Sequence, residues 1–573
     1  MERSGMQSEG GVITPDYGMG DEAAVPGSKV LHRKIDWTGA FWVASGVPAL
    51  VLFSIGSVAA TVGRPSWMVW TASILLGFIQ SFTYAEIAGL FPNKSGGASV
   101  YGAVAWVRYS KLIAPVSVWC NWLAWSPVLA LGSGLAAGFV LSTLFSPDSA
   151  INAWQLTLLD LGFLKGGLTL RINSVFLLGA AILVSTFAIQ HGGILRSART
   201  TMVLGVIALV PLIAIALVPV FTGSLPHTNF FPLVPIARDA QGVISEGHWD
   251  MAGITVLMGG MFMAAWSTYG FETAVCYTRE FRDPKNDTFK AIFYSGLLCL
   301  FVFSFLPLAF QAHLGLGHLV TPAQLDAKGQ VVAQAVYDGM LAPDIYSGTG
   351  VAKVLSEMIR GGAVVGHVVI AMLVLALALS IMTSMAGSSR TLYQASVDGW
   401  LPRYLSHVNE HGAPTHAMWT DLCFNLILLT MSDYVFVLAA SNVCYLLFNF
   451  LNLNAGWIHR IDRPNVERPF RAPTWVIAVG GLLSFVNLAF MGIGADIWGP
   501  NTLLTGVVLA ALIVPVFWYR HYFQDRGVFP EDMLEDMHLT PGEATEKRAG
   551  FLPYLALLAG VAVVFVGWRI AVY

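Results

Sequence analysis

Charged side chains are scarce in this chain of 573 residues. Asp, Glu, Lys and Arg make up 11% of the sequence, whereas hydrophobic residues make up 55% and the mean hydropathy is +0.65. Soluble globular domains carry about 25% charged residues, so this composition excludes a water-soluble protein. The sequence therefore predicts a chain that is largely embedded in a lipid bilayer.

Cysteine is also rare. The chain contains five: Cys120, Cys276, Cys299, Cys423 and Cys444. All lie in or at the edge of apolar segments and none forms a CxxC pair, so we interpret them as small core residues without a disulfide or metal framework. A nucleotide-binding glycine loop, an HExxH motif and a nucleophile–base pair are absent as well. We therefore expect no cofactor, no nucleic-acid partner and no enzymatic activity.

Long apolar segments fill most of the chain after a polar, glycine-rich start. A membrane-spanning helix needs about 20 apolar residues. Thirteen segments are candidates, centred near residues 49, 79, 128, 182, 208, 264, 302, 374, 423, 445, 485, 511 and 561. We therefore predict an all-α integral membrane protein with about 12–13 transmembrane helices.

Basic residues are unequally divided between the two sides of these segments. If residues 1–36 are cytosolic, 23 of the 31 Lys and Arg residues fall on the cytosolic side. Cytosolic loops carry such an excess in membrane proteins, and the reverse orientation would violate this rule. With no cleavable signal peptide in residues 1–36, the first span must direct insertion. We predict a multi-pass protein of the cell membrane with a cytosolic N-terminus.

The segments divide into two groups of five, and an odd number per group inverts the second group relative to the first. The predicted parts are a cytosolic tail (1–36), a first five-helix repeat (37–221), a second five-helix repeat (222–457), helices eleven and twelve (458–521), a polar cytosolic linker (522–549) and a further transmembrane helix (550–573). Two long outer loops, 222–250 and about 315–360, are expected to be solvated connectors that could hold short helices, or else a gating lid or a partner surface.

The first and sixth segments each contain residues that interrupt an α-helix. The first is interrupted at residues 45–48 (SGVP), where Pro48 lacks an N–H and clashes with the carbonyl four residues earlier. The sixth is interrupted at residues 267–270 (STYG). Hydrocarbon cannot satisfy the freed backbone groups, so each break must face protein, water or a bound solute. An ordinary proline kink is the alternative at Pro48, but two matched breaks indicate a transporter site near the bilayer midplane.

Residues around both breaks, and two residues of the third segment, are the candidate substrate-binding groups. The half-helix after Pro48 would offer free N–H groups and a positive dipole end to a carboxylate. Asn121 and Trp125 are four residues apart and so share one helix face, although an intramembrane Asn also often bonds a neighbouring helix. The predicted binding residues are Ser45, Gly46, Val47, Pro48, Ala49, Asn121, Trp125, Trp266, Ser267, Tyr269 and Gly270.

Glu272 lies deep in the sixth apolar segment, with Arg279 as the nearest basic residue in sequence. A buried carboxylate is unfavourable unless it is paired or protonated, and an acid inside the membrane is a functional candidate. Glu272 is the predicted proton carrier or substrate sensor, and the alternative is a neutral side chain bonded to a freed backbone group. The candidate sodium ligands are Ser380, Thr383 and Ser384 in the eighth segment, although such hydroxyls more often bond their own helix.

Four motifs occur in an order that resembles the amino acid–polyamine–organocation permease superfamily. They are residues 81–88 (SFTYAEIA) with 91–101 (FPNKSGGASVY), 269–272 (YGFE) with 282–285 (RDPK), 389–393 (SRTLY) with 398–402 (DGWLP), and 468–473 (RPFRAP). The resemblance implies a five-plus-five inverted-repeat (LeuT-like) fold with helices 1 and 6 discontinuous, and transport by alternating access. It also implies that residues 45–49 hold the carboxylate of an amino acid, that carbonyls of residues 266–269 hold its amine, and that Trp266 acts as a gate.

The chain departs from that family at two places. Gly46 is followed by Val47 and Pro48 where the family usually has a Gly-Ser-Gly-like stretch. The bulkier residues would change how the backbone holds the carboxylate of a substrate. Ala208, three residues before Pro211, stands where some proton-coupled members have Lys. Glu272 therefore remains the foremost proton carrier, with sodium coupling or uncoupled exchange still open.

The predicted function is a secondary transporter for an amino acid, acting by proton symport or by exchange across the bilayer. One carboxylate and several aromatic rings favour a neutral substrate, because a polyamine would need more acidic groups. A polyamine or organic-cation transporter is the first alternative. A channel or a transport-like sensor on the same fold is the second.

Overall fold

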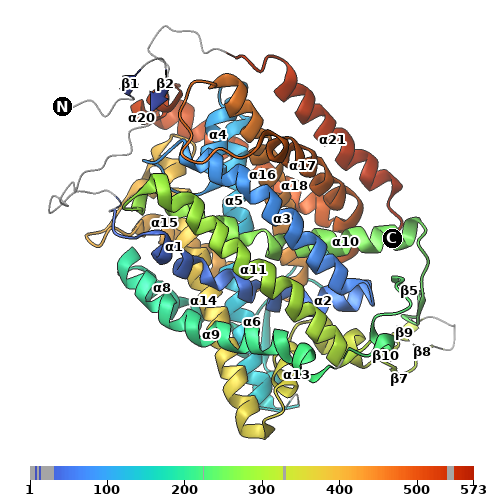
Figure 1. Cartoon of the computed structure of the whole chain (residues 1–573). Coiled ribbons are helices and arrows are strands. Elements are labelled where there is room, and N and C mark those ends of the chain that lie inside the picture. The colour runs from blue at the N-terminus through green and yellow to red at the C-terminus, as the bar shows by residue number, and fades with distance from the viewer. Residues whose placement is uncertain are drawn as a thin grey trace.

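The computed structural model describes residues 7–9, 12–14, 31, 33–146, 148–223, 225–326, 331–537 and 547–573. Most of the predicted N-terminal tail and residues 538–546 of the predicted linker lie outside these ranges. The described chain is predominantly helical, as the sequence predicts, and the helices pack into one bundle (Figure 1).

The bundle is built mainly from α-helices, whose lengths run from the 6 residues of α19 to the 36 residues of α14. These are α1 Trp37–Val43, α2 Val51–Val62, α3 Ser66–Gly89, α4 Ala98–Trp106, α5 Ile113–Trp125, α6 Val128–Leu144, α8 Ser174–Gln190, α9 Ile194–Thr222, α10 Met251–Thr268, α11 Pro284–Leu314, α14 Gly362–Val397, α15 Thr415–Leu428, α16 Tyr434–Asp462, α17 Thr474–Gly494, α18 Thr502–Ala511, α19 Ile513–Trp518, α20 Glu531–Met537 and α21 Leu552–Ile570. The 3₁₀ helices η1 Ala44–Leu50 and η3 Gly270–Glu280 continue α1 and α10, η6 Ala495–Trp498 continues α17, and the π-helical η7 Tyr519–Gln524 continues α19.

Short elements fill the connections. They are β1 Gln7–Glu9, β2 Val12–Thr14, α7 Ala150–Ala153, β3 Gln155–Asp160, β4 Thr169–Asn173, η2 His227–Asn229, β5 Ile236–Arg238, β6 Ile244–Glu246, β7 Leu319–Thr321, β8 Gln324–Leu325, β9 Val331–Ala333, β10 Val336–Tyr337, η4 Gly339–Leu341, α12 Pro343–Tyr346, α13 Val351–Met358 and η5 Arg403–Ser406. The strands form antiparallel pairs, β1–β2, β3–β4, β5–β6, β7–β10 and β8–β9. The two outer loops therefore hold strand pairs as well as short helices.

Eleven continuous helical segments within the described ranges are long and apolar enough to cross a membrane, and the last of them is α21. Some of these segments join two or three consecutive helices. The other two predicted spans, centred near residues 182 and 423, form α8 with 17 residues and α15 with 14 residues. Both are shorter than the roughly 20 residues that span hydrocarbon along the normal. Cys423 on α15 is exposed, so the interpretation of all five cysteines as core residues is wrong for this one.

Acidic residues fix where several of the long helices begin. The carboxylate of Asp36 accepts a hydrogen bond from the N–H of Gly39 at the start of α1. Asp250, Asp283 and Asp433 cap α10, α11 and α16 in the same way. A side-chain acceptor at this position satisfies a backbone donor that the helix itself leaves free. These polar caps therefore set the ends of the apolar segments.

Both interruptions predicted from the sequence are present as changes of helix type. The first span changes from α1 to the 3₁₀ helix η1, which contains Pro48 and is buried throughout, and then to α2. The sixth span stays α-helical through Thr268 and continues as η3 from Gly270, so this change begins later than residue 267. The N–H of Val51 bonds the carbonyl of Pro48. The first break is thus a tightened turn that keeps some backbone hydrogen bonds, and it is not an open gap.

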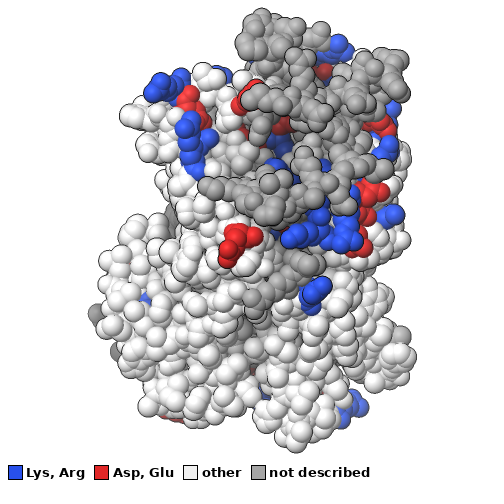
Figure 2. All heavy atoms as spheres, turned by 90° about the vertical axis from the view of Figure 1, so that its left-hand side faces the viewer, with Lys and Arg blue, Asp and Glu red and all other residues white. Residues whose placement is uncertain are grey.

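The two 3₁₀ helices lie against each other inside the bundle. α14 packs on η1 and on α6 and α9, α16 packs on α5 and α17, and α3 runs beside α11 (Figure 1). Figure 2 shows the side of the molecule that lies at the left in Figure 1. Lys, Arg, Asp and Glu gather toward the upper end of this side, and few of them lie toward the lower end. We call this the charged end. α4 and α20 lie at the same end in Figure 1.

Candidate functional site

The two helix breaks are joined by direct side-chain contacts. Ser267 donates a hydrogen bond from Oγ to the carbonyl oxygen of Leu50 over 3.2 Å, and its Oγ lies 3.1 Å from Oγ of Ser54. A methyl group added at Gly270 would lie 3.1 Å from a methyl carbon of Leu50 and 3.2 Å from one of Val47. Glycine at position 270 therefore lets η3 approach η1 closely.

A hydroxyl from α14 braces the first break. Thr383 donates from Oγ1 to the carbonyl of Val43 over 2.6 Å and accepts from the N–H of Gly46 over 3.2 Å. Its oxygen thus satisfies one backbone acceptor and one backbone donor at the point where α1 ends. A methyl group at Gly46 would lie 2.5 Å from this oxygen, so the close approach of α14 requires glycine there.

The other predicted residues of the first break are buried but point to different neighbours. Ser45 donates to the carbonyl of Trp42 in its own helix, over 2.6 Å, and its Oγ lies next to Gly205 of α9. Pro48 and Ala49 are buried in the same 3₁₀ turn. Val47 is the member of this group that contacts the sixth span, at Gly270.

Glu272 and Trp125 meet at the centre of the bundle. The indole N–H of Trp125 donates to Oε1 of Glu272 over 3.1 Å, and the Glu272 side chain is buried. No described residue forms a hydrogen bond with the other carboxylate oxygen, Oε2. An unpaired buried carboxylate oxygen is unfavourable, so this atom calls for a proton, a cation or a solute donor.

Asn121 lies one helical turn from Trp125 and faces the same region. Its Nδ2 donates to Oγ of Ser99 over 2.5 Å and lies 3.5 Å from Oγ1 of Thr391. Its Oδ1 has no hydrogen-bond partner among the described residues. A methyl group at Gly97 would lie 3.8 Å from Asn121 Nδ2 and 3.9 Å from Glu272 Oε2. The unpaired carboxylate oxygen of Glu272 and the side-chain amide of Asn121 therefore lie beside Gly97.

Aromatic rings enclose this polar region. Trp266 donates from its indole to the carbonyl of Ala124 and to Oγ of Ser441, both over 3.2 Å, and its ring lies 6.3 Å from that of Trp125. Tyr269 donates to Oδ1 of Asn487 over 3.0 Å. The rings of Trp125, Trp266 and Tyr269 thus form a buried aromatic wall beside Glu272.

Tyr445 of α16 belongs to the same aromatic wall and was not predicted. Its ring lies 5.5 Å from that of Trp125 and 6.3 Å from that of Tyr269, and its hydroxyl is buried with no hydrogen-bond partner among the described residues. A tyrosine in an apolar helix looks like a packing residue in the sequence, and only its neighbours reveal the free hydroxyl.

The three candidate sodium ligands lie on α14, and their hydroxyls are largely used by the protein backbone. Ser380 donates to the carbonyl of Ala376 over 3.0 Å, Thr383 braces the first break, and Ser384 is buried. Within the described ranges, no group of three or more His, Cys, Asp or Glu side chains could hold a metal ion.

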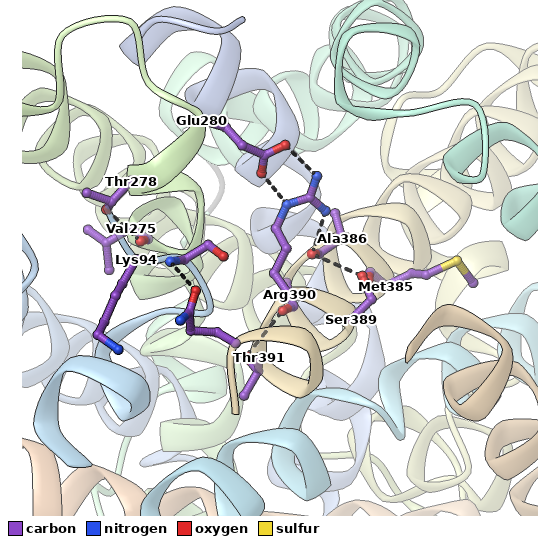
Figure 3. Close-up of polar contacts among 12 residues, drawn as sticks. Lys94, Val275, Thr278, Glu280, Met385, Ala386, Ser389, Arg390 and Thr391 are labelled. Atoms are coloured by element: carbon purple, nitrogen blue, oxygen red, sulfur yellow. Dashed lines mark hydrogen bonds and ion pairs between the residues drawn. The ribbon is translucent and has the colours of Figure 1, made fainter. Parts of the chain in front are cut away.

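A buried ion pair connects the end of the sixth span to α14 (Figure 3). The guanidinium of Arg390 faces the carboxylate of Glu280 and donates to both of its oxygens, one of them over 2.9 Å. Arg390 also donates to the carbonyl of Ala386 over 2.9 Å. Both side chains are almost fully buried. The pair was not predicted, although Arg390 falls in the SRTLY motif and Glu280 lies eight residues after Glu272.

A second buried acid, Asp421 of α15, was also missed. It accepts hydrogen bonds from the indole of Trp122 over 2.6 Å and from the hydroxyl of Ser126 over 2.8 Å, and the hydroxyl of Ser388 donates to its other oxygen. Its position in an apolar segment is the signal that singled out Glu272 and could have found it. Its oxygens are saturated by neutral donors, so Asp421 holds α5, α14 and α15 together.

Comparison with known proteins identifies the family. The family described as "Amino acid permease" matches residues 35–518. The chain belongs to this amino acid permease family. The resemblance to the amino acid–polyamine–organocation superfamily is thereby confirmed, and family membership makes this permease a multi-pass membrane transporter.

Two branched-chain amino acid permeases align with most of this permease at low identity, and a polyamine transporter aligns with a short part of it. The branched-chain amino acid permease BcaP of Lactococcus lactis is 21% identical over 471 residues, which cover 80% of this chain and 88% of the relative. The branched-chain amino acid permease BcaP of Bacillus subtilis is 22% identical over 490 residues, covering 82% and 90%. The polyamine transporter PUT1 of Oryza sativa is 27% identical, but over only 131 residues, covering 21% and 24%.

Proposed function

We propose that this permease moves a small neutral amino acid across the membrane by alternating access, with the substrate held between η1 and η3. The observation that carries this proposal is the free carboxylate oxygen of Glu272, buried next to the contact between the two helix breaks. The substrate ammonium group would bind near Glu272 and Asn121 Oδ1. The apolar rings of Trp125, Trp266 and Tyr445 would surround an apolar side chain.

A branched aliphatic side chain is the substrate feature that we favour. Val47, Leu50 and Phe53 contribute apolar groups from the first span, and Phe53 lies 5.7 Å from the ring of Trp266. The alignment over most of the chain with two branched-chain amino acid permeases supports the same class.

Glu272 is proposed to carry a proton during transport, in symport or in exchange. One indole donor serves one of its oxygens, so the ionised form is poorly compensated and a proton or a substrate cation would relieve it. Sodium coupling through Ser380, Thr383 and Ser384 is the lesser candidate, because two of these hydroxyls already donate to backbone carbonyls.

A polyamine substrate is the second candidate, supported by the short alignment with PUT1. A polyamine carries two or more positive charges, whereas Glu272 is the one acidic side chain among the described residues that lies at the two breaks with an oxygen free. Asp421 has its oxygens occupied by Trp122, Ser126 and Ser388. We therefore rank a neutral amino acid above a polyamine.

The proposed topology is two inverted five-helix repeats, 37–221 and 222–457, in the cell membrane, with the N-terminus and the charged end in the cytosol. The excess of basic residues on the side of residues 1–36 supports this orientation. Residues 458–521 would form helices eleven and twelve outside the repeats, and residues 522–549 a cytosolic linker to α21.

The test is uptake into liposomes that contain the purified permease. Labelled leucine, isoleucine, valine, alanine, lysine and putrescine are offered with and without a pH gradient, and empty liposomes serve as the control. We expect saturable uptake and counterflow of the branched aliphatic amino acids, stimulated by the pH gradient. Unsaturable flux would indicate a channel, and ligand binding without flux would indicate a sensor. No uptake of any amino acid or amine would refute the proposal.

A further inference from the structure

Residues 94–97 form a loop between α3 and α4 that leads directly to the proposed substrate site. We call it the wedge loop. The N–H of Gly96 donates to the carbonyl of Cys276 in η3 over 3.0 Å, and the carbonyl of Gly96 accepts from Oγ1 of Thr391 in α14 over 2.8 Å. Gly97 adjoins Glu272 and Asn121. The loop is thus bonded between the sixth and eighth spans beside the site, at the charged end.

The first residue of the wedge loop, Lys94, forms ion pairs with two acidic residues. Lys94 is buried and its ammonium group forms ion pairs with Asp398, just after α14, and with Asp536 of α20, the latter over 2.6 Å from Nζ to Oδ2. Burial alone would lower the pKa of Lys94, but the charges of Asp398 and Asp536 outweigh it and raise the pKa above its ordinary value. The polar linker before α21 is therefore attached to the loop beside the site.

The same linker buries further groups at the charged end. Met533 is fully buried, and the ring of Phe529 lies 5.1 Å from that of Trp400. Residues 529–537 are thus docked on the ends of the second, eighth and tenth spans through both apolar and ionic contacts.

Arg463 contacts the docked segment but is only partly satisfied there. Arg463 donates from Nη2 to the carbonyl of Asp536, but its buried Nε and Nη1 have no hydrogen-bond partner among the described residues. Burial and the nearby charge of Arg108 lower the pKa of Arg463 to about 9, although the charges of Asp536 and Asp462 act in the opposite direction. Buried donors without acceptors are unfavourable, so the docked state combines a favourable ion pair at Lys94 with unpaired donors at Arg463. Such a balance suits a contact that forms and breaks.

We propose that residues 529–537 are an autoinhibitory latch, in which Asp536 holds Lys94 and keeps the wedge loop closed over the substrate site at the charged end. The latch rests on the proposed transport function, since opening toward this end requires the wedge loop to leave the gap between η3 and α14. Asp536 is the residue to change, because Lys94 also neutralises Asp398 and cannot be removed cleanly.

The test compares Asp536→Asn with Glu531→Gln, which removes an exposed acid from the same helix, and with Asp536→Glu, which keeps the charge. Two quantities are measured: the maximal rate of uptake into liposomes, and the rate at which N-ethylmaleimide alkylates Cys276, followed cysteine by cysteine with mass spectrometry. Cys276 lies under the wedge loop, where a methyl group at Gly97 would be 2.7 Å from its sulfur. Cys299, buried in α11, reports general loosening.

We expect Asp536→Asn to raise both rates about twofold to fivefold, as the loss of one partly exposed ion pair would, while Cys299 and both comparison variants stay as in the wild type. Unchanged alkylation of Cys276 would overturn the latch, and so would equal acceleration at Cys299. Faster alkylation of Cys276 alone, in a permease that transports no tested solute, would support the latch and refute the proposed function.

Discussion

The indole N–H of Trp125 donates to one carboxylate oxygen of Glu272, and the second oxygen has no partner among the described residues. The first residue lies in the third span and the second just after the break of the sixth. This single hydrogen bond makes the protonation and the position of Glu272 dependent on one side chain. Variants of Glu272 and of Trp125 therefore test the two partners separately.

Replacing Glu272 with Gln should abolish the dependence of uptake on a pH gradient. The amide keeps the shape and can still accept from Trp125, but it neither binds nor releases a proton in the accessible pH range. The measurement is initial uptake into liposomes with an acidic or a neutral outer medium. Full retention of gradient-driven accumulation would remove Glu272 from the coupling role.

Trp125→Phe should lower the apparent affinity for substrate by about 10-fold to 150-fold, because a hydrogen bond to a charged group contributes about 1.5–3 kcal/mol. The pH profile of uptake should shift as well, since the ionised form of Glu272 loses its donor. Trp119→Phe is the matched control: this indole lies two turns earlier and donates to the carbonyl of Leu509. Similar KM and pH profiles for both variants would contradict the role of Trp125.

Gly270→Ala should block transport while the protein stays folded. The added methyl group would lie 2.6 Å from a ring carbon of Trp125 in α5 and would also crowd Leu50 and Val47 of η1, at 3.1 and 3.2 Å. Overpacking of this kind destabilises by about 1–3 kcal/mol. Gly138→Ala in the third span is the control, since its methyl group would meet Thr349 at an ordinary 3.8 Å. Wild-type uptake by the Gly270 variant would show that the close contact is not required.

Thr383→Val should reduce both uptake and thermal stability, because it leaves the N–H of Gly46 and the carbonyl of Val43 without their partner. Unpaired buried groups cost about 1–3 kcal/mol. Thr383→Ser keeps the hydroxyl and should restore both properties. Uptake is compared with and without sodium: loss of a sodium dependence in the Val variant alone would mean that Thr383 binds the ion.

Arg390→Met should destabilise the permease by about 3–5 kcal/mol, since it leaves the buried carboxylate of Glu280 without its charge partner. The double variant Arg390→Met, Glu280→Met should recover much of this loss, because neither charge is then buried alone. Thermal unfolding in detergent measures both. A double variant no more stable than the single one would show that the pair contributes more than mutual neutralisation.

Sequence patterns were sufficient for the local features of this permease. The apolar runs, Pro48 and the STYG stretch predicted eleven of the thirteen expected spans and the two breaks, because helix length and backbone hydrogen bonding depend on residues close together in the chain. The exact start of the second break was not predicted. α10 continues to Thr268, and the change of helix type follows at Tyr269 and Gly270, where η3 packs on η1 and Trp125.

Pairing across the bundle was decided by the tertiary structure alone. Trp125 and Glu272 are 147 residues apart, and Gly46 and Thr383 are 337 apart. No local sequence pattern predicts that Thr383 of α14 bonds the backbone at the first break. Nor does one predict that Asp421 accepts three hydrogen bonds, or that Asp536 forms an ion pair with Lys94. The sequence thus determined which segments enter the bilayer and where their helices weaken, since both follow from local hydrophobicity and backbone chemistry. Helix packing determined which polar groups meet, because only the folded bundle brings distant donors and acceptors within bonding distance.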